Sequence, residues 1–209
     1  MSMLLLLIIG YLLGSLNFSI IFTKLFADTD VREHGSGNAG FTNTLRTAGK
    51  KAAVLVFVFD ALKAVAAILI AYVFQRYLPF DGMVEYCKYA AALGVVLGHN
   101  FPLYYGFKGG KGVVVSIAII FSLNWISGCF VLGMFLVVFL ISGYVSLGSL
   151  SGAVTLVAAT AVMYIFDIHG VDVVQLTFMT VLAILSFYMH RGNIKHLLNG
   201  TENGFKNKK

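Results

Sequence analysis

The stretch MLLLLIIGYLLGSLNFSIIF, residues 3–22, runs for twenty residues without a charged side chain. A helix that rises about 1.5 Å per residue needs about 20 mainly apolar residues to cross roughly 30 Å of hydrocarbon. No Lys or Arg precedes this stretch and no small-residue cleavage site follows it, so we expect a retained span rather than a signal peptide. The stretch therefore predicts a fold built inside a membrane.

The composition of the whole chain agrees with this. The 209 residues are 59% hydrophobic and 11% charged, with a mean hydropathy of +0.88, whereas soluble domains are about 45–50% apolar and about 25% charged. A water-soluble globule is excluded, and we expect no nucleic-acid partner. Cys87 and Cys129 form no C-x-x-C pair, so they are expected to be packing residues.

Seven apolar stretches predict an all-α integral membrane domain that occupies residues 1–209 and crosses seven times. They lie near residues 3–26, 52–75, 86–106, 112–123, 125–147, 150–166 and 171–189. Residues 112–147 allow a single long tilted helix as an alternative, but Ser122-Leu123-Asn124-Trp125 favours a bend because it combines polar residues with an interface-seeking Trp. Segment 112–123 is short for a full crossing and is expected to be tilted or assisted by the loop before it.

The charges predict the orientation, because cytoplasmic loops collect Lys and Arg. Seven spans place twelve of the fifteen basic residues on one side. These are Lys24, Arg32, Arg46, Lys50, Lys51, Lys108, Lys111, Arg191, Lys195, Lys206, Lys208 and Lys209. The opposite side receives Arg76 and Lys88 together with Asp81, Glu85, Asp167 and Asp172. We therefore predict an N-terminus outside and a cytoplasmic C-terminus.

Four polar stretches fall at the cytoplasmic boundary in this topology. They are GSGNAGFTNTLRTAGKK (35–51), GHNFPLYYGFKGGKGV (98–113), YVSLGS (144–149) and HRGNIKHLLNGTE (190–202). Glycines let backbone N–H groups approach an anion, and Ser, Asn, Arg and Lys side chains donate to phosphate oxygens. The stretches therefore predict a phosphate-binding site, although each loop taken alone is also compatible with a flexible interfacial segment.

Two nucleotide-binding motifs are matched only in part, so the sequence does not favour nucleotide binding. GSGNAG (35–40) has the G-x-G-x-x-G spacing but lacks the preceding strand and the acidic residue about 20 positions on; Asp60, the nearest, lies inside an apolar stretch. GFKGGKGV (106–113) resembles a P-loop, but its first Gly stands one residue too close to the Gly-Lys pair. Gly112 also occupies the position where Ser or Thr would hold magnesium.

Asp60 and Lys63 are three residues apart inside an apolar stretch, so they share one helix face. A charged pair within a membrane is costly and suggests a function, but we favour the interpretation that the pair neutralises itself and fixes one helix against another. His190 is either a helix cap or, with Arg191 and Asn193 beside it, part of an active site.

The motifs GSGNAGFTNTLR, GHNFPLYYGFKGGKGV and HRGNIKHLLNGTE, in this order on a chain of this length, resemble those of the bacterial acyl-phosphate:glycerol-3-phosphate acyltransferases, the PlsY family. The resemblance implies a seven-span inner-membrane enzyme, with its site at the cytoplasmic face, that acylates the 1-hydroxyl of glycerol 3-phosphate from acyl phosphate. We also expect the protein to work as a monomer and to need no metal or cofactor. In place of the Gly that commonly follows the Lys of the family's D-x-x-K, this chain has Ala64.

The resemblance also implies the site residues. The catalytic residues carried over are Ser36, Arg46, Lys111, His190 and Asn193, and the substrate-binding residues are Gly37, Asn38, Asn43, Lys108, Gly109, Gly110, Gly112 and Ser149. Glu202 is implied to be structural.

Acyl phosphate already carries a good leaving group, so the hydroxyl of glycerol 3-phosphate is expected to attack it directly. His190 or a substrate phosphate would take the proton, and no His is followed five residues later by Asp, which favours the phosphate. The rival classes are a transporter of organic phosphate and a lipid-headgroup-binding protein. Transport is not favoured, because the sequence shows no internal repeat and its polar motifs gather on one face.

Overall fold

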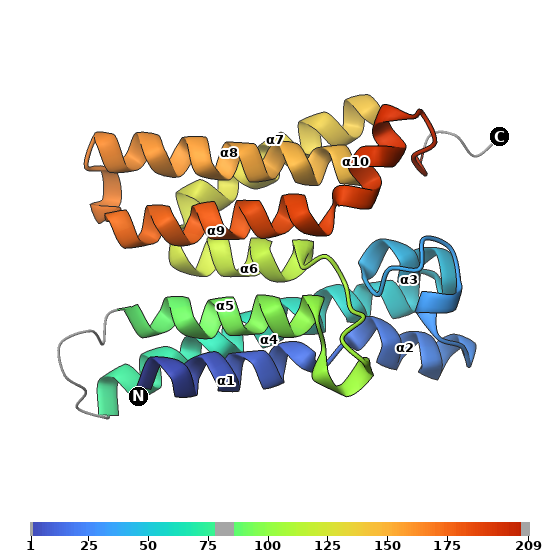
Figure 1. Cartoon of the computed structure of the whole chain (residues 1–209), viewed down its shortest axis with the longest axis horizontal. Coiled ribbons are helices and arrows are strands. Elements are labelled where there is room, and N and C mark those ends of the chain that lie inside the picture. Colours follow the sequence, from blue (N-terminus) through green and yellow to red (C-terminus); the bar gives the residue numbers. More distant parts are fainter. Residues whose placement is uncertain (1, 78–85, 206–209) are drawn as a thin grey trace. The chain divides into compact units, whose positions relative to one another are not determined.

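The computed structural model describes residues 2–77 and 86–205, which belong to two compact units, Met1–Ser122 (unit 1) and Leu123–Lys209 (unit 2). Every regular element in these ranges is a helix (Figure 1), which confirms the predicted all-α class. Five charges used to predict the orientation lie outside the described residues. They are Asp81, Glu85, Lys206, Lys208 and Lys209.

Unit 1 begins with a broken helix where the sequence predicted one span over 3–26. Helix α1 covers Ser2–Ser15 and α2 covers Phe18–Ala27. Asn17 caps α2, since its Oδ1 accepts a hydrogen bond of 3.2 Å from the backbone N–H of Ile20. A Ser or Asn side chain at such a position competes with the helix for backbone hydrogen bonds, which is the physical reason for the break.

Helix α1 packs side by side with α5 (Cys87–Asn100) (Figure 1). The contact depends on glycines, because a Cβ added at Gly14 would overlap the carbonyl oxygen of Val95, and one at Gly98 would overlap that of Tyr11. Small residues allow helix backbones to approach closely in a membrane. This close contact fixes the position of the segment that follows α5.

The remaining elements of unit 1 connect and cover this pair. They are η1 (Val31–Glu33), α3 (Phe41–Thr47), α4 (Gly49–Tyr77), η3 (Leu103–Tyr105) and most of α6 (Val113–Leu123). Helix α5 ends six residues before the predicted end of the span 86–106. Pro102 explains the difference, since a proline disfavours the helical conformation of the residue before it.

Unit 2 contains three long helices and one short one. They are α7 (Trp125–Ser142), α8 (Val145–Ile165), α9 (Val173–Met189) and α10 (Arg191–Leu198), with η4 (Ile168–Gly170) between α8 and α9. The predicted break before Trp125 is present, and Asn124 Oδ1 accepts a hydrogen bond of 3.0 Å from Ser127 N. Helix α8 begins five residues earlier than predicted, so YVSLGS lies mostly inside a helix.

Four segments of the described ranges are long and apolar enough to cross a membrane: Ser2–Ala27, Gly49–Tyr77, Trp125–Ser142 and Val145–Ile165. Helices α9 and α10, bent by 57°, supply a fifth if they count as one span. Helices α5 and α6 have 14 and 11 residues, which amounts to about 21 and 17 Å at about 1.5 Å per residue. Two of the seven predicted spans are therefore short helices.

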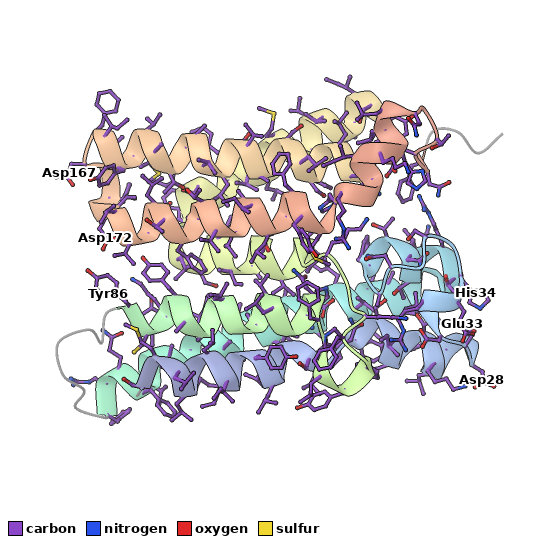
Figure 2. The ribbon with its side chains drawn as sticks, viewed as in Figure 1. Asp28, Glu33, His34, Tyr86, Asp167 and Asp172 are labelled. Carbon is purple, nitrogen blue, oxygen red and sulfur yellow. The ribbon has the colours of Figure 1, made fainter. Side chains whose placement is uncertain are left out.

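In each unit, the connections between helices lie at two opposite ends. In Figure 2, Asp28, Glu33 and His34 mark the end of unit 1 that carries the α2–α3 connection, while Tyr86 marks the opposite end. In unit 2, Asp167 and Asp172 mark the α8–α9 connection, at the end opposite α10 (Figure 2). The predicted site motifs of each unit thus lie at one of its ends.

Candidate functional site

In unit 1 the connection between α2 and α3 (residues 28–40, the first loop) is joined to the connection between α5 and α6 (residues 101–112, the second loop). Arg32 Nη1 donates to the carbonyl oxygens of Tyr105, at 2.7 Å, and Lys108, at 3.3 Å. The N–H of Ala39 donates to Gly109 O at 3.4 Å. The prediction that these two motifs share one region is confirmed.

Arg32 itself is oriented by Asp30. Arg32 Nη2 lies 2.7 Å from Asp30 Oδ2. This hydrogen bond lowers the pKa of the Asp30 carboxyl and raises the pKa of the Arg32 guanidinium. A charged Arg32 is thus available to bind carbonyl oxygens of the second loop. Sequence analysis counted Arg32 only as a cytoplasmic charge and missed this contact between loops.

Asn43 lies beneath the first loop with only 1% of its surface exposed. Its Nδ2 donates to Val31 O at 2.8 Å and to His34 O at 2.9 Å, and its Oδ1 accepts from Ser36 N at 3.1 Å. Both amide hydrogens are therefore taken by backbone carbonyls. Asn43, expected to donate to the substrate, instead shapes the loop that carries Ser36.

Three glycines of the two loops use their N–H groups within the protein, although such groups were expected to face an anion. Gly37 N donates to His34 O, Gly109 N to Asn100 O and Gly110 N to His99 O, at 3.0–3.2 Å. Glycine is required there for conformation and close packing: Gly37 has a φ of +67°, and a Cβ at Gly109 would overlap His99 O. These three N–H groups are therefore bonded within the protein, and Ser, Arg and Lys side chains are the other donors at these loops.

The candidate donors of unit 1 come from three elements. Ser36 and Asn38 belong to the first loop, where Ser36 is exposed. Arg46 lies in the last turn of the short helix α3, which is anchored by a 2.6 Å hydrogen bond between the hydroxyls of Thr44 and Ser19. Lys108 and Lys111 flank Gly109 and Gly110 in the second loop, and Gly112, with a φ of +74°, turns the chain into α6.

In unit 2 the carboxylate of Glu202 joins the start of α8 to α10. Its Oε1 accepts from Ser146 Oγ at 2.6 Å and from Asn193 Nδ2 at 2.7 Å, and Phe205 N donates to Gly143 O at 3.0 Å. The prediction that YVSLGS and the C-terminal motif lie together is confirmed within this unit. Ser149 is buried, and its hydroxyl donates to Val145 O at 2.9 Å.

His190 stands at the bend between α9 and α10, and 2% of its surface is exposed. Its Nδ1 lies 2.8 Å from Ser186 O. A carbonyl oxygen only accepts, so we assign the proton to Nδ1, and in the neutral ring Nε2 is then the basic nitrogen. This tautomer is the one that a proton acceptor at Nε2 requires.

An open apolar groove with a volume of about 470 Å³ lies between α8 and α9. Its lining consists of Ala153, Val154, Val157, Ala158, Thr180, Ala183, Ile184 and Phe187. Phe187 is three residues before His190 on the same helix. A wall of this composition suits a hydrocarbon chain.

Within the described ranges, no group of three or more His, Cys, Asp or Glu side chains could hold a metal ion. The structure brings Ser36, Asn43, Gly109 and Gly110 into one assembly in unit 1, and Ser146, Asn193 and Glu202 into another in unit 2. Sequence analysis missed the supporting residues Ser19, Arg32 and His99. The only signal for these three residues in the sequence is that they are polar and lie within or next to apolar stretches.

Comparisons with known proteins agree over almost the whole chain. The family model described as glycerol-3-phosphate acyltransferase matches residues 4–200. Relatives of that name include one from Halalkalibacterium halodurans, 43% identical over 98% of this chain and 96% of its own length, and one from Clostridioides difficile, 40% identical over 97% and 95%.

A solved structure extends the similarity to the fold. It is the glycerol 3-phosphate form of PlsY (YgiH), an integral membrane glycerol 3-phosphate acyltransferase. It superposes with a TM-score of 0.84 at 37% identity and covers 98% of this chain and 96% of its own. A lysphosphatidic acid form of PlsY gives a TM-score of 0.82. The chain belongs to the glycerol-3-phosphate acyltransferase family, as a relative of the integral membrane protein PlsY.

Proposed function

We propose that this protein transfers a fatty acyl group from acyl phosphate to the 1-hydroxyl of glycerol 3-phosphate, giving lysophosphatidic acid and inorganic phosphate. The observation that carries the proposal is the junction of the two basic loops of unit 1, made by Arg32 and by Ala39 with Gly109. The forms in which PlsY was solved, with glycerol 3-phosphate and with lysophosphatidic acid, support the same substrate and product here.

Side chains bind the phosphate groups in this proposal. Arg46 offers a bidentate guanidinium, Lys108 and Lys111 offer point charges, and Ser36 offers a hydroxyl. Gly37, Gly109, Gly110 and Gly112 contribute by letting the loops adopt their shape, since the N–H groups of the first three are already bonded. Asn38 and Ser149 border the substrates. The fatty chain lies in the open apolar groove of unit 2.

The reaction needs no acyl-enzyme. The hydroxyl oxygen of glycerol 3-phosphate attacks the acyl carbon, the bond from that carbon to the phosphate oxygen breaks, and phosphate leaves with the bonding electrons. Arg46 and Lys111 stabilise the negative charge that develops. The hydroxyl proton passes to His190 Nε2 or to the leaving phosphate, and Asn193, fixed by Glu202, borders the reacting groups.

His190→Gln separates the two proton acceptors. A fall in kcat of about a hundredfold or more, with both substrates saturating, would assign the proton to His190. A near-parental kcat would assign it to the phosphate. The folded state of the variant is checked by its thermal midpoint.

The membrane arrangement is also proposed. Seven passes, with the N-terminus outside and the C-terminus in the cytoplasm of a bacterial cell, bring the loops to the cytosol, where glycerol 3-phosphate is dissolved. The charge distribution supports this orientation. The protein is proposed to work as a monomer.

The test is turnover by the purified protein in lipid with palmitoyl phosphate and glycerol 3-phosphate. We expect phosphate release that requires both substrates and is lost in Ser36→Ala and Arg46→Ala. Arg76→Ala is the matched control, because Arg76 is an exposed arginine in the last turn of α4, far along the chain from either loop. Failure of the parent protein to turn over acyl phosphate would overturn the proposal.

The place of the fatty chain in the groove of unit 2 has its own test. Ala183→Phe fills part of the space between α8 and α9, so we expect the preference to shift from palmitoyl towards shorter acyl phosphates while the KM for glycerol 3-phosphate stays the same. An unchanged chain-length preference would place the fatty chain elsewhere.

A further inference from the structure

The buried ion pair of unit 1 has a third member that the sequence did not reveal. Lys63 Nζ lies 2.6 Å from Asp60 Oδ1, as the helical spacing predicted, and both side chains are at most 3% exposed. His99, at the end of α5, places its Nδ1 3.1 Å from Lys63 Nζ and 3.6 Å from Asp60 Oδ1. Asp60, Lys63 and His99 are called the buried cluster below.

Lys63 contacts the break in the first helix. Its Nζ donates to Leu16 O at 2.8 Å and to Gly14 O at 3.2 Å, and it lies 5.4 Å from the ring centre of Phe18. Carbonyl groups at the end of a helix have no partner in the helix itself, and in hydrocarbon they need one from elsewhere. Lys63 therefore holds the point at which α2 begins, and α2 leads directly into the first loop.

His99 contacts the second loop. Its carbonyl oxygen accepts a 3.1 Å hydrogen bond from Gly110 N. A Cβ added at Gly110 would overlap His99 Nε2 and would lie 2.6 Å from Ala39 O, so the imidazole packs against Gly110 where the two loops meet. Since Nδ1 faces an ammonium that only donates, Nδ1 accepts and Nε2 carries the proton.

A pair that only neutralised itself would need neither contact. We propose that Lys63 and His99 are positioning residues, which set the two phosphate-binding loops relative to each other, and that Asp60 supplies the buried counter-charge that keeps Lys63 in place. This inference rests on the proposed function and deepens it, because the loops it concerns bind glycerol 3-phosphate there. Neither residue is required to touch the substrate.

The proposal predicts a selective kinetic effect. Moving either loop weakens the binding of glycerol 3-phosphate most, because this substrate is bound by the loops alone, whereas the donor is also held by its fatty chain in unit 2. We therefore expect Lys63→Met and His99→Asn to raise the KM for glycerol 3-phosphate about tenfold or more and to change the KM for palmitoyl phosphate by less than about twofold. Because both act through one contact chain, the double variant is expected to be about as impaired as the worse single variant.

The measurement is steady-state kinetics in lipid, with both substrates varied and the thermal midpoint of each variant recorded. Lys88→Met is the matched control, since Lys88 lies near the other end of α5 and its Nζ lies 5.2 Å from the ring centre of Tyr89. Its kinetics are expected to equal those of the parent. Asp60→Asn with Lys63→Met removes both charges together and provides a variant without an unpaired buried carboxylate.

The outcomes separate this inference from the function on which it rests. A parent without turnover would overturn the proposed function and the inference with it. An active parent whose variants keep the parental KM for glycerol 3-phosphate would overturn the inference alone. Equal changes for both substrates, or failure of every cluster variant to fold, would assign the cluster to folding and would also overturn it.

Discussion

Residues 2–27 and 173–198 each form a broken helix, and the two breaks are stabilised in different ways. At the break between α1 and α2, the carbonyls of Gly14 and Leu16 receive hydrogen bonds from Lys63, 49 and 47 residues away in the sequence. At the bend between α9 and α10, His190 bonds to Ser186 O, four residues before it, through its own N–H and its own ring. The first break, which begins with a local cap at Asn17, is therefore also held by a distant side chain, whereas these bonds of His190 at the second break are local.

The largest effect is expected when the remote partner of the first break is removed. Lys63→Met leaves the Asp60 carboxylate buried and unpaired, so the free energy of unfolding should fall by about 3–5 kcal/mol. Chemical unfolding in detergent measures this. Asp60→Asn with Lys63→Met should recover part of the loss, and a parental unfolding midpoint for Lys63→Met would show that the first break does not depend on Lys63.

On the C-terminal side of the second break, the carboxylate of Glu202 makes the hydrogen bonds that join α10 to the start of α8. Glu202→Ala removes the acceptor of both Ser146 and Asn193, and we expect a loss of about 2 kcal/mol in the free energy of unfolding and a fall in kcat. Glu202→Gln keeps a carbonyl acceptor and should lose less. Equal losses for the two variants would mean that the negative charge, rather than the two hydrogen bonds, is what matters.

Asn17 and Asn124 are both N-cap residues, so substituting each of them compares the first break with an ordinary helix start. Asn17→Ala and Asn124→Ala each remove an N-cap hydrogen bond, so each should lower the free energy of unfolding by about 1 kcal/mol. Only Asn17→Ala is expected to raise the KM for glycerol 3-phosphate, because α2 leads into the first loop. If both variants raised this KM equally, the break would have no special connection to the loop.

The smallest expected effect is the loss of stability from the Asp30–Arg32 pair of the first loop at low pH. Arg32 lowers the pKa of the Asp30 carboxyl, so this pair stabilises the folded protein above the carboxyl pKa of the unfolded chain, and the contribution is lost as pH falls through the lower folded value. The difference in thermal midpoint between the parent and Asp30→Asn should therefore be larger at pH 6 than at about pH 3. A difference independent of pH would contradict this origin.

Sequence analysis predicted features that depend on local chemistry. The break at Asn124 was predicted from polar residues that interrupt an apolar stretch, and the all-helical class from the lengths of the apolar stretches. The common location of the motifs was predicted from the distribution of charges, and the structure bears it out within each unit. The signal of interrupting polar residues was also present in Gly14-Ser15-Leu16-Asn17 but was hidden by the apolar residues around it. The second short helix, α6, was recognised as too short for an ordinary crossing, whereas the early end of α5 at Asn100 was missed.

Other features could not be predicted because they depend on distant contacts. A glycine-rich loop can present its N–H groups to an anion or pack closely against another backbone, and the sequence does not distinguish the two. Gly109 and Gly110 pack closely against the backbone at the end of α5. The role of Lys63 depends on His99, 36 residues later, and on the carbonyl of Leu16, which no helical spacing relates to it.

The most direct test of the account is the stoichiometry of products formed by the purified protein in lipid from palmitoyl phosphate and glycerol 3-phosphate, with palmitoyl-CoA as the competing donor. We expect lysophosphatidic acid and inorganic phosphate to appear in equal amounts from palmitoyl phosphate, and no product from palmitoyl-CoA. Lysophosphatidic acid formed only from palmitoyl-CoA, or none from either donor, would contradict the proposed reaction.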